Sequence, residues 1–123
     1  MGDQGVATLE DGLYVLEKNL ADPAFVDKMA RFVRASMKGW AWARENSDAA
    51  ADIVLENDET GAQTENHQRR MMGEINKLTA GGGKLDEADY ERTVATLMSG
   101  GSDPVISKAP SGAWSHAIWD AAF

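Results

Sequence analysis

Apolar side chains recur every three or four residues between Pro23 and Asn46, the spacing of one helix face. At about 100° per residue they gather on one side of a helix, with basic residues opposite. The apolar side consists of Phe25, Met29, Phe32, Val33, Ser36, Met37, Trp40 and Ala43. Asp22 and Pro23 supply an N-cap and a first-turn proline. The pattern predicts an amphipathic helix of about six turns that packs on a core.

Shorter stretches repeat this pattern and are bounded by capping residues or glycines. Ser47 or Asn46 can cap the second helix, and Asp86 followed by Asp89 resembles the capping arrangement of the fourth. Gly81-Gly82-Gly83 marks the end of the third helix. The predicted helices cover residues of about 23–45, 48–56, 65–78, 86–99 and 113–122.

Residues 6–16 have a different character. Leu13, Tyr14, Val15 and Leu16 are four successive apolar residues that follow a turn-prone Asp-Gly pair, which predicts one short, buried strand. A lone strand has no pairing partner within the chain and is rarely stable by itself. The expected fold is therefore mainly α with one short strand, and residues 1–123 are expected to form a single partial domain.

Composition narrows the function classes. The 123 residues are 43% hydrophobic and 26% charged, a normal globular mixture. Twelve basic against 20 acidic side chains give a formal net charge of −8, which repels a phosphate backbone, so no nucleic-acid partner is expected. The absence of cysteine excludes disulfides, thiolate metal sites and cysteine nucleophiles. The first ten residues lack the basic and apolar regions of a signal peptide.

No constellation in the sequence predicts catalysis, a metal site or a cofactor. His67 has no second ligand at the spacing of a zinc site. Ser115-His116 lacks an orienting acid and an oxyanion hole nearby in the sequence. Gly81-Gly82-Gly83-Lys84 follows a helix instead of a strand, and Leu85 stands where a phosphate loop has serine or threonine, so a flexible connector is expected. The chain is not expected to be an enzyme.

Two charged runs are interpreted as solvated surface. They are Lys28, Arg31, Arg34 and Lys38, and Asp48, Asp52, Glu56, Asp58 and Glu59. The first could also dock an acidic permease surface or bind an anion, and the second could hold a cation, although it lacks the spacing of an EF-hand. Trp40 and Trp42 are two residues apart on one helix and cannot both face the same core. One of them is expected to be partly exposed, at a surface for a missing lobe or for self-association.

Three stretches together resemble a known family. They are Asp11-Gly12-Leu13-Tyr14-Val15, then Asp22-Pro23 and a helix with Ala35-Ser36-Met37-Lys38-Gly39-Trp40, then Glu45-Asn46-Ser47-Asp48-Ala49-Ala50. Their order and spacing are similar to those of ABC-transporter periplasmic solute-binding proteins, in the group for nitrate, sulfonates such as taurine, and thiamine-pyrimidine precursors. The resemblance covers residues of about 6–78 and continues weakly to Trp114. Ser47 departs from the proline common in the family.

The resemblance implies the C-terminal helical part of an α/β two-lobe type II periplasmic binding protein, with an N-terminal lobe missing. The implied function is binding of a small organic or anionic solute for an ABC permease, in the periplasm. Asp11, Gly12 and Tyr14 would lie near the crossover between lobes, where Asp11 could accept a ligand hydrogen bond and Tyr14 could stack on a heterocycle. Two alternatives stay open: a small helical protein-interaction module that associates through its tryptophans, and a fragment similar to thiamine-pyrimidine synthases.

Overall fold

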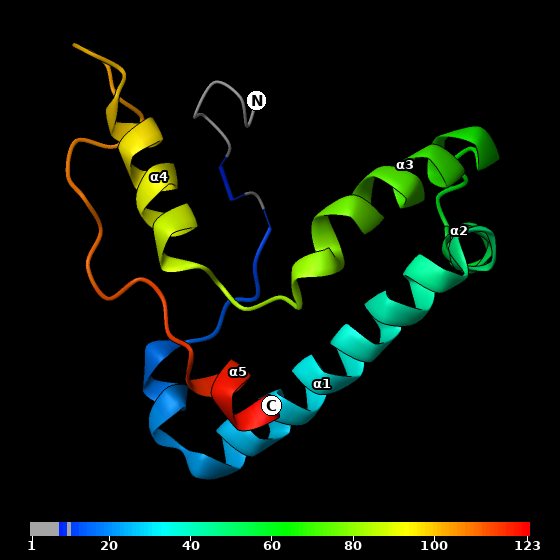
Figure 1. Cartoon of the computed structure of the whole chain (residues 1–123), viewed down its shortest axis with the longest axis horizontal. Coiled ribbons are helices and arrows are strands. Elements are labelled where there is room, and N and C mark those ends of the chain that lie inside the picture. The colour runs from blue at the N-terminus through cyan, green and yellow to red at the C-terminus, as the bar shows by residue number, and fades with distance from the viewer. Residues whose placement is uncertain (1–7, 10) are drawn as a thin grey trace.

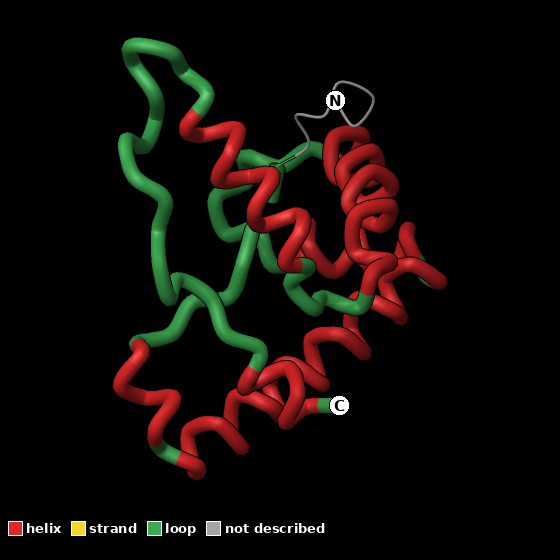
Figure 2. The backbone as a smooth tube through the Cα atoms, turned by 60° about the vertical axis from the view of Figure 1, so that its left-hand side comes forward, coloured by secondary structure: helices red, strands yellow, loops and turns green. Residues whose placement is uncertain are grey.

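The fold is taken from a computed structural model that describes residues 8, 9 and 11–123. Within these residues every regular element is a helix, and no strand is present (Figure 2). The elements in chain order are the 3-10 helix η2 (Glu17–Ala21), α1 (Pro23–Glu45), α2 (Ser47–Glu56), α3 (Glu65–Leu78), the 3-10 helix η3 (Thr79–Gly81), α4 (Glu87–Met98) and α5 (Ala117–Ala122). The mainly helical character predicted from the sequence is therefore correct.

The strand predicted over residues 6–16 is wrong for the part that the structure describes. Residues 11–16 have no regular secondary structure and lead into η2, while residues 6, 7 and 10 lie outside the described part. The physical reason is that a strand needs a neighbouring strand for its backbone hydrogen bonds. No such neighbour exists among the described residues, so the apolar run forms no strand there.

The last helix is also shorter than predicted. It was expected over 113–122, but α5 begins at Ala117. The Ser115 hydroxyl accepts a hydrogen bond from the Ala117 amide at 3.2 Å, and Gly112 has a φ of 63°. Local side-chain bonding of this kind competes with helix formation, and the positive φ ends regular backbone just before it.

Most helix starts follow the capping rules. The carboxylates of Asp22 and Asp86 accept backbone amides in the first turns of α1 and α4, at 2.9 and 3.0 Å. Thr64, which the sequence analysis did not identify, caps α3. Asn46 is different, because its side chain donates back to the Trp42 carbonyl at 2.9 Å. Asn46 is therefore both the C-cap of α1 and the N-cap of α2, where its carbonyl accepts the Ala50 amide at 2.9 Å but its side chain makes no capping bond.

The long helix α1 organises the molecule (Figure 1). With 23 residues it is about 35 Å long. The helix α5 packs beside its N-terminal half, and the α2–α3 pair lies at its other end. Arg34, expected to be solvated, donates from Nε to the carbonyl of Ala122 at 2.9 Å and so satisfies the C-terminal end of α5.

The helix α4 stands apart from this arrangement. It shares few contacts with the other described helices, and the segment that follows it returns along one side of the molecule to α5 (Figure 1). Loops hold it in place: the amide of Leu9 donates to the hydroxyl of Thr93 at 2.9 Å, and the amide of Ile106 donates to the carbonyl of Leu97 at 3.3 Å.

The buried core is small. Ala30, Val33 and Ala122 join α1 to α5, with Met37, Ile118 and Trp119 packed around them half-buried. Among the described residues, the other buried ones are Ala43, Ala50 and Ala51, and no large side chain is fully buried. The chain exposes 9269 Å², whereas a folded monomer of its 13.3 kDa mass exposes roughly 6,500 Å². Several helices therefore leave apolar faces uncovered.

Gly83 is the position where the connector between α3 and α4 meets the core. Its φ is 77°, and a Cβ there would lie 2.7 Å from the sulfur of Met37. We expect Gly83→Ala to lower the free energy of unfolding by about 1–2 kcal/mol for the left-handed backbone, and further because Met37 must move. Gly82→Ala is the matched control, since φ is 76° there but no atom lies within 4 Å of the added methyl. Equal losses in urea denaturation would show that Met37 does not pack against Gly83.

Candidate interaction surface

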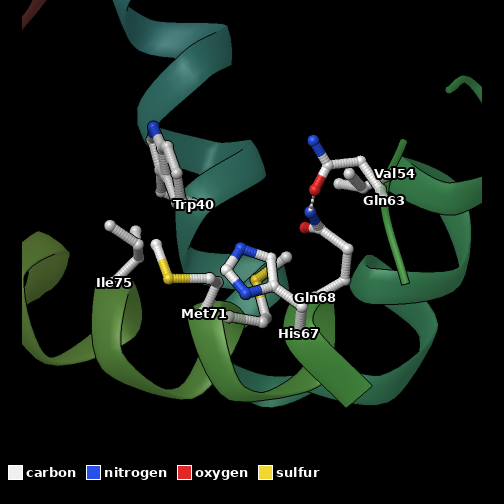
Figure 3. A pocket seen from close by; sticks show the side chains of 8 residues that line it. Trp40, Val54, Gln63, His67, Gln68, Met71 and Ile75 are labelled. Carbon is white, nitrogen blue, oxygen red and sulfur yellow. Dashed lines mark hydrogen bonds between the residues drawn. The ribbon is translucent and has the colours of Figure 1, made fainter. Parts of the chain in front are cut away.

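An apolar hollow of about 350 Å³ lies between α1, α2 and α3. It is defined here as the α1–α3 groove and is lined by Trp40, Val54, Met71, Met72 and Ile75, with Gln63, His67 and Gln68 at its polar side. Figure 3 shows Trp40 on α1 facing Met71 and Ile75 on α3. Met71 and Ile75 are four residues apart and share one helix face. The groove is an apolar surface that the described chain does not cover.

The two neighbouring tryptophans have separate positions. Trp40 is 36% exposed and lines the groove, whereas Trp42 is 44% exposed and does not. The sequence analysis predicted partial exposure of one, and the structure shows it for both. Indole rings and methionine thioethers supply large, adaptable contact area, which suits docking of another polypeptide. Within the described residues, no group of histidine, aspartate or glutamate side chains is placed to hold a metal ion.

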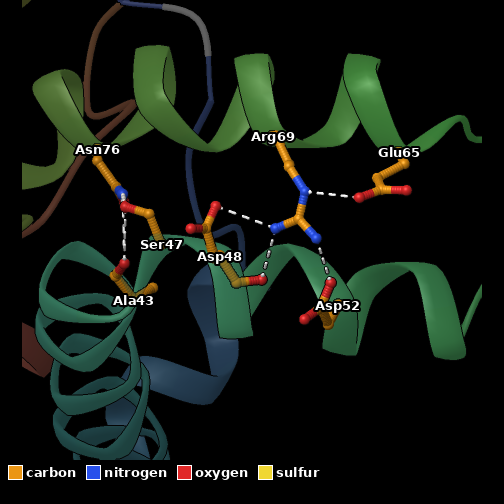
Figure 4. A network of polar contacts seen from close by, with 7 residues as sticks. All are labelled: Ala43, Ser47, Asp48, Asp52, Glu65, Arg69 and Asn76. Atoms are coloured by element: carbon orange, nitrogen blue, oxygen red, sulfur yellow. Dashed lines mark hydrogen bonds and ion pairs between the residues drawn. The ribbon is translucent and has the colours of Figure 1, made fainter.

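Arg69 fixes the orientation of the two helices that flank the groove (Figure 4). Its guanidinium contacts Asp48 at 3.0 Å and Asp52 at 2.9 Å on α2, and Glu65 at 3.0 Å on its own helix. The hydrogen bond that Arg69 donates to Glu65 is the main reason why the pKa of Arg69 is raised. Two members of the predicted solvated acidic run therefore hold α2 beside α3.

Asp58, in the loop between α2 and α3, also has a structural role. Its carboxylate accepts hydrogen bonds from the Thr60 side chain and, at 2.8 Å, from the Gln63 amide. These bonds, the one from Thr60 first, lower the pKa of Asp58. Seven residues further along α3 and on the same helix face as Arg69, Asn76 donates to Ser47 at 3.0 Å and to the carbonyl of Ala43 at 3.3 Å (Figure 4). The walls of the groove are thus fixed by polar contacts at several points.

The predicted flexible connector after α3 is held by α5. The indole nitrogen of Trp119 donates to the carbonyl of Gly82 at 3.2 Å, and the ammonium of Lys84 bonds the carboxylate of Asp120 at 2.8 Å. Lys84 also lies 4.5 Å from the Trp119 ring centroid, a cation–π distance. His116 lies 2.8 Å from the Leu85 carbonyl. These contacts between residues 82–85 and 116–120 are defined here as the α5 clasp.

Acid should weaken the α5 clasp. The hydrogen bond and charge of Lys84 lower the pKa of Asp120 below its ordinary value of 3.8. Because the pKa is lower in the folded state, the stabilisation is present above the unfolded value and is lost as pH falls through the folded value. We expect Asp120→Asn to abolish this component of acid sensitivity, measured by tryptophan fluorescence between about pH 5 and pH 2. Asp103→Asn removes a loop carboxylate as control, and an unchanged acid profile for Asp120→Asn would contradict the expectation.

The predicted ligand residues Asp11, Gly12 and Tyr14 lie together on the exposed segment before η2. Tyr14 is 86% exposed, and none of the three lines the α1–α3 groove or the second hollow, of about 480 Å³, beside Lys84 and His116. Their contact with a solute stays a prediction. The groove itself was missed, because the apolar stripe of Met71, Met72 and Ile75 predicted a helix but not what would cover it.

Comparisons with known proteins found no match to this chain. No protein-family model, no curated protein and no solved structure matches the chain. None of the described helices is long and apolar enough to cross a membrane.

Proposed function

We propose that this chain is the helical C-terminal portion of a solute-binding protein of an ABC importer, which binds a small organic or anionic nutrient and delivers it to a permease. The observation that carries the proposal is the small core. A surface of 9269 Å², against the roughly 6,500 Å² of a compact monomer of this mass, supports the proposal because helices that pack on a further layer leave apolar area exposed without it. Helices of an α/β lobe keep an apolar face for the sheet.

The residues that carry the family resemblance differ in exposure. Trp40 lines the α1–α3 groove, whereas Ala50 is buried where α1 turns into α2. Only Asn46 separates the two helices. Trp40 suits packing against a further part of the protein, and at this residue the resemblance and the open surface support the same interpretation.

By the same resemblance, the ligand is a sulfonate, nitrate or a pyrimidine precursor, and the protein works in the periplasm. Asp11 and Tyr14 would contribute one hydrogen-bond acceptor and one stacking ring from the exposed segment before η2. A second lobe would then supply the rest of the cleft, and closure over the ligand would create the form that the permease recognises.

The proposal is tested on the native protein, isolated from its source cells with an antibody against this chain. We expect an intact mass well above 13.3 kDa, and thermal stabilisation by taurine, nitrate or a hydroxymethylpyrimidine. A ligand at about 100 times its Kd stabilises by about 2.7 kcal/mol. Tyr14→Ala should reduce the stabilisation, whereas Tyr90→Ala, on α4, should not. A native mass of 13.3 kDa without any ligand response would overturn the proposal.

The α1–α3 groove favours a second candidate, a helical interaction module that binds another polypeptide. Apolar, methionine-lined grooves accept amphipathic helices. Sedimentation of the 123-residue chain distinguishes the two candidates: a mass that rises with concentration and returns to the monomer value in Trp40→Ala would favour self-association. Trp42→Ala is the control, because Trp42 is exposed outside the groove.

A further inference from the structure

One face of α1 is exposed along most of the helix. At about 100° per residue its members fall on one side, opposite the residues that pack on α5. The outer α1 face is defined here as Asp27, Lys28, Arg31, Phe32, Ala35, Lys38, Gly39, Trp42 and Glu45. Every one of these residues is exposed, Phe32 by 54% and Trp42 by 44%. The described chain therefore leaves two aromatic rings of one helix face in solvent.

Gly39 lies near the middle of this face, where the described part of the chain does not require a glycine. A glycine in the interior of a helix is destabilising relative to alanine. Here no described atom lies within 4 Å of the position that a Cβ would take. Ala35 is four residues earlier on the same face. Two small residues at this spacing allow the backbone of another helix to approach closely.

The outer α1 face is complementary to itself in the antiparallel direction. When two copies of α1 cross at the level of Met37 around a twofold axis, positions equally far from Met37 face each other. Ala35 then faces Gly39 of the second copy, and Phe32 faces Trp42 of the second copy. Small residues meet at the crossing, and aromatic rings meet on both sides of it.

The charges of this face also suit a second copy. The chain carries a formal net charge of −8, but the outer α1 face has three basic side chains against two acidic ones. A second copy therefore meets less like charge here than on the rest of the surface. In the antiparallel arrangement, Arg31 of each copy comes beside Glu45 of the other, on the same edge of the face. Glu45 has no ion pair among the described residues, whereas Arg31 contacts Asp27 at 3.1 Å and has room for a second carboxylate.

We propose that two copies of this chain associate through the outer α1 face, as an antiparallel helix pair with twofold symmetry. Ala35 and Gly39 allow the close approach, Phe32 and Trp42 supply apolar area, and the charges at the two ends fix the direction. One helix face is small for an interface, so the dimer is weak and depends on concentration. The inference goes beyond the proposed function and does not rest on it, because this face lies outside the α1–α3 groove.

Gly39→Leu tests the close approach. Leucine favours a helix more than glycine and meets no described atom, so the monomer should keep its helical circular dichroism. Between two helices the added side chain would hold the backbones apart, so the Kd of the dimer should rise about tenfold or more in sedimentation equilibrium. Gly73→Leu is the matched control, because Gly73 lies within α3 and again has no atom within 4 Å of the added Cβ. An unchanged Kd in Gly39→Leu would overturn the inference.

An exchange of charges tests the antiparallel direction. Arg31→Glu and Glu45→Arg should each raise the Kd of the dimer by roughly 3- to 10-fold, since each brings like charges together at two symmetric positions. The double variant should restore the Kd, because the pair then forms with its charges reversed. A double variant as weak as the single ones, or a chain that stays monomeric up to about 1 mM, contradicts the proposed dimer.

Trp40→Ala distinguishes this surface from the α1–α3 groove. It should leave the Kd of the dimer unchanged, whereas Trp42→Ala should raise it. The reverse result would assign self-association to the groove and overturn the inference. None of these measurements involves a solute, so a native protein without a ligand response would count against the proposed function alone.

Discussion

Replacing Trp119 by alanine should lower the free energy of unfolding by about 3 kcal/mol, the largest loss expected from any single substitution in this chain. Trp119 packs on the cluster of Ala30, Val33 and Ala122 between α1 and α5. It also donates the hydrogen bond to Gly82 in the α5 clasp, and its ring lies tilted against that of Phe123, with 4.9 Å between centroids. Because the core is so small, one large side chain accounts for much of it.

Urea denaturation followed by circular dichroism measures this loss. Trp119→Phe keeps an aromatic ring and removes the indole donor, so it should cost about 1 kcal/mol, the usual value of one hydrogen bond. Trp42→Ala, at an exposed site, should change stability by less than about 0.5 kcal/mol. A similar loss for Trp119→Ala and Trp42→Ala would mean that α5 does not pack on α1.

Ala51→Leu should have the second largest effect, a loss of about 1–3 kcal/mol from overpacking. Ala51 is 0% exposed, on the helix that packs mainly against α3. The larger side chain must push α2 from α3, which also strains the contacts of Arg69 with Asp48 and Asp52. The α1–α3 groove should widen with it, and Trp40 fluorescence should shift to longer wavelength.

Ala49→Leu is the matched control for this prediction. It makes the same substitution two residues earlier on the same helix, at an exposed position. Leucine and alanine are both strong helix formers, so the change should be within about 0.5 kcal/mol. Thermal melts of the two variants, measured in parallel, distinguish the effect of packing on stability from the effect of helix propensity. If Ala51→Leu is as stable as Ala49→Leu, α2 is not packed as the structure has it.

The helices were the part of the fold that the sequence predicted correctly. The range of α1 agrees with the structure because its signals are local: Asp22 and Pro23 at the start and a sustained apolar stripe after them. The strand was wrong because strand formation depends on a distant neighbour, and Leu13–Leu16 finds none among the described residues. The hydrophobic pattern of a segment indicates that it is able to form a strand. Whether the strand forms depends on a second strand to pair with.

The candidate surface could be predicted only in part from the sequence, because it too depends on contacts between distant residues. An apolar stripe such as Met71 and Ile75 predicts that one helix face avoids water, but not which partner covers it. The sequence indicated a surface at Trp40 and Trp42 through their spacing alone. The joint role of Arg69, Asp48 and Asp52 needed three dimensions, since the aspartates lie 21 and 17 residues before the arginine.

The isolation of α4 has a consequence for how the chain resists degradation. A helix held by loop contacts and by an edge-to-face contact of Tyr90 with Trp114 can open while α1 and α5 stay folded. Proteases cleave whichever region opens at the lowest free energy, and at that point the global stability of the protein offers no protection. Proteolysis of this protein would therefore begin at α4. Substitutions that stabilise the α1–α5 core would not slow it.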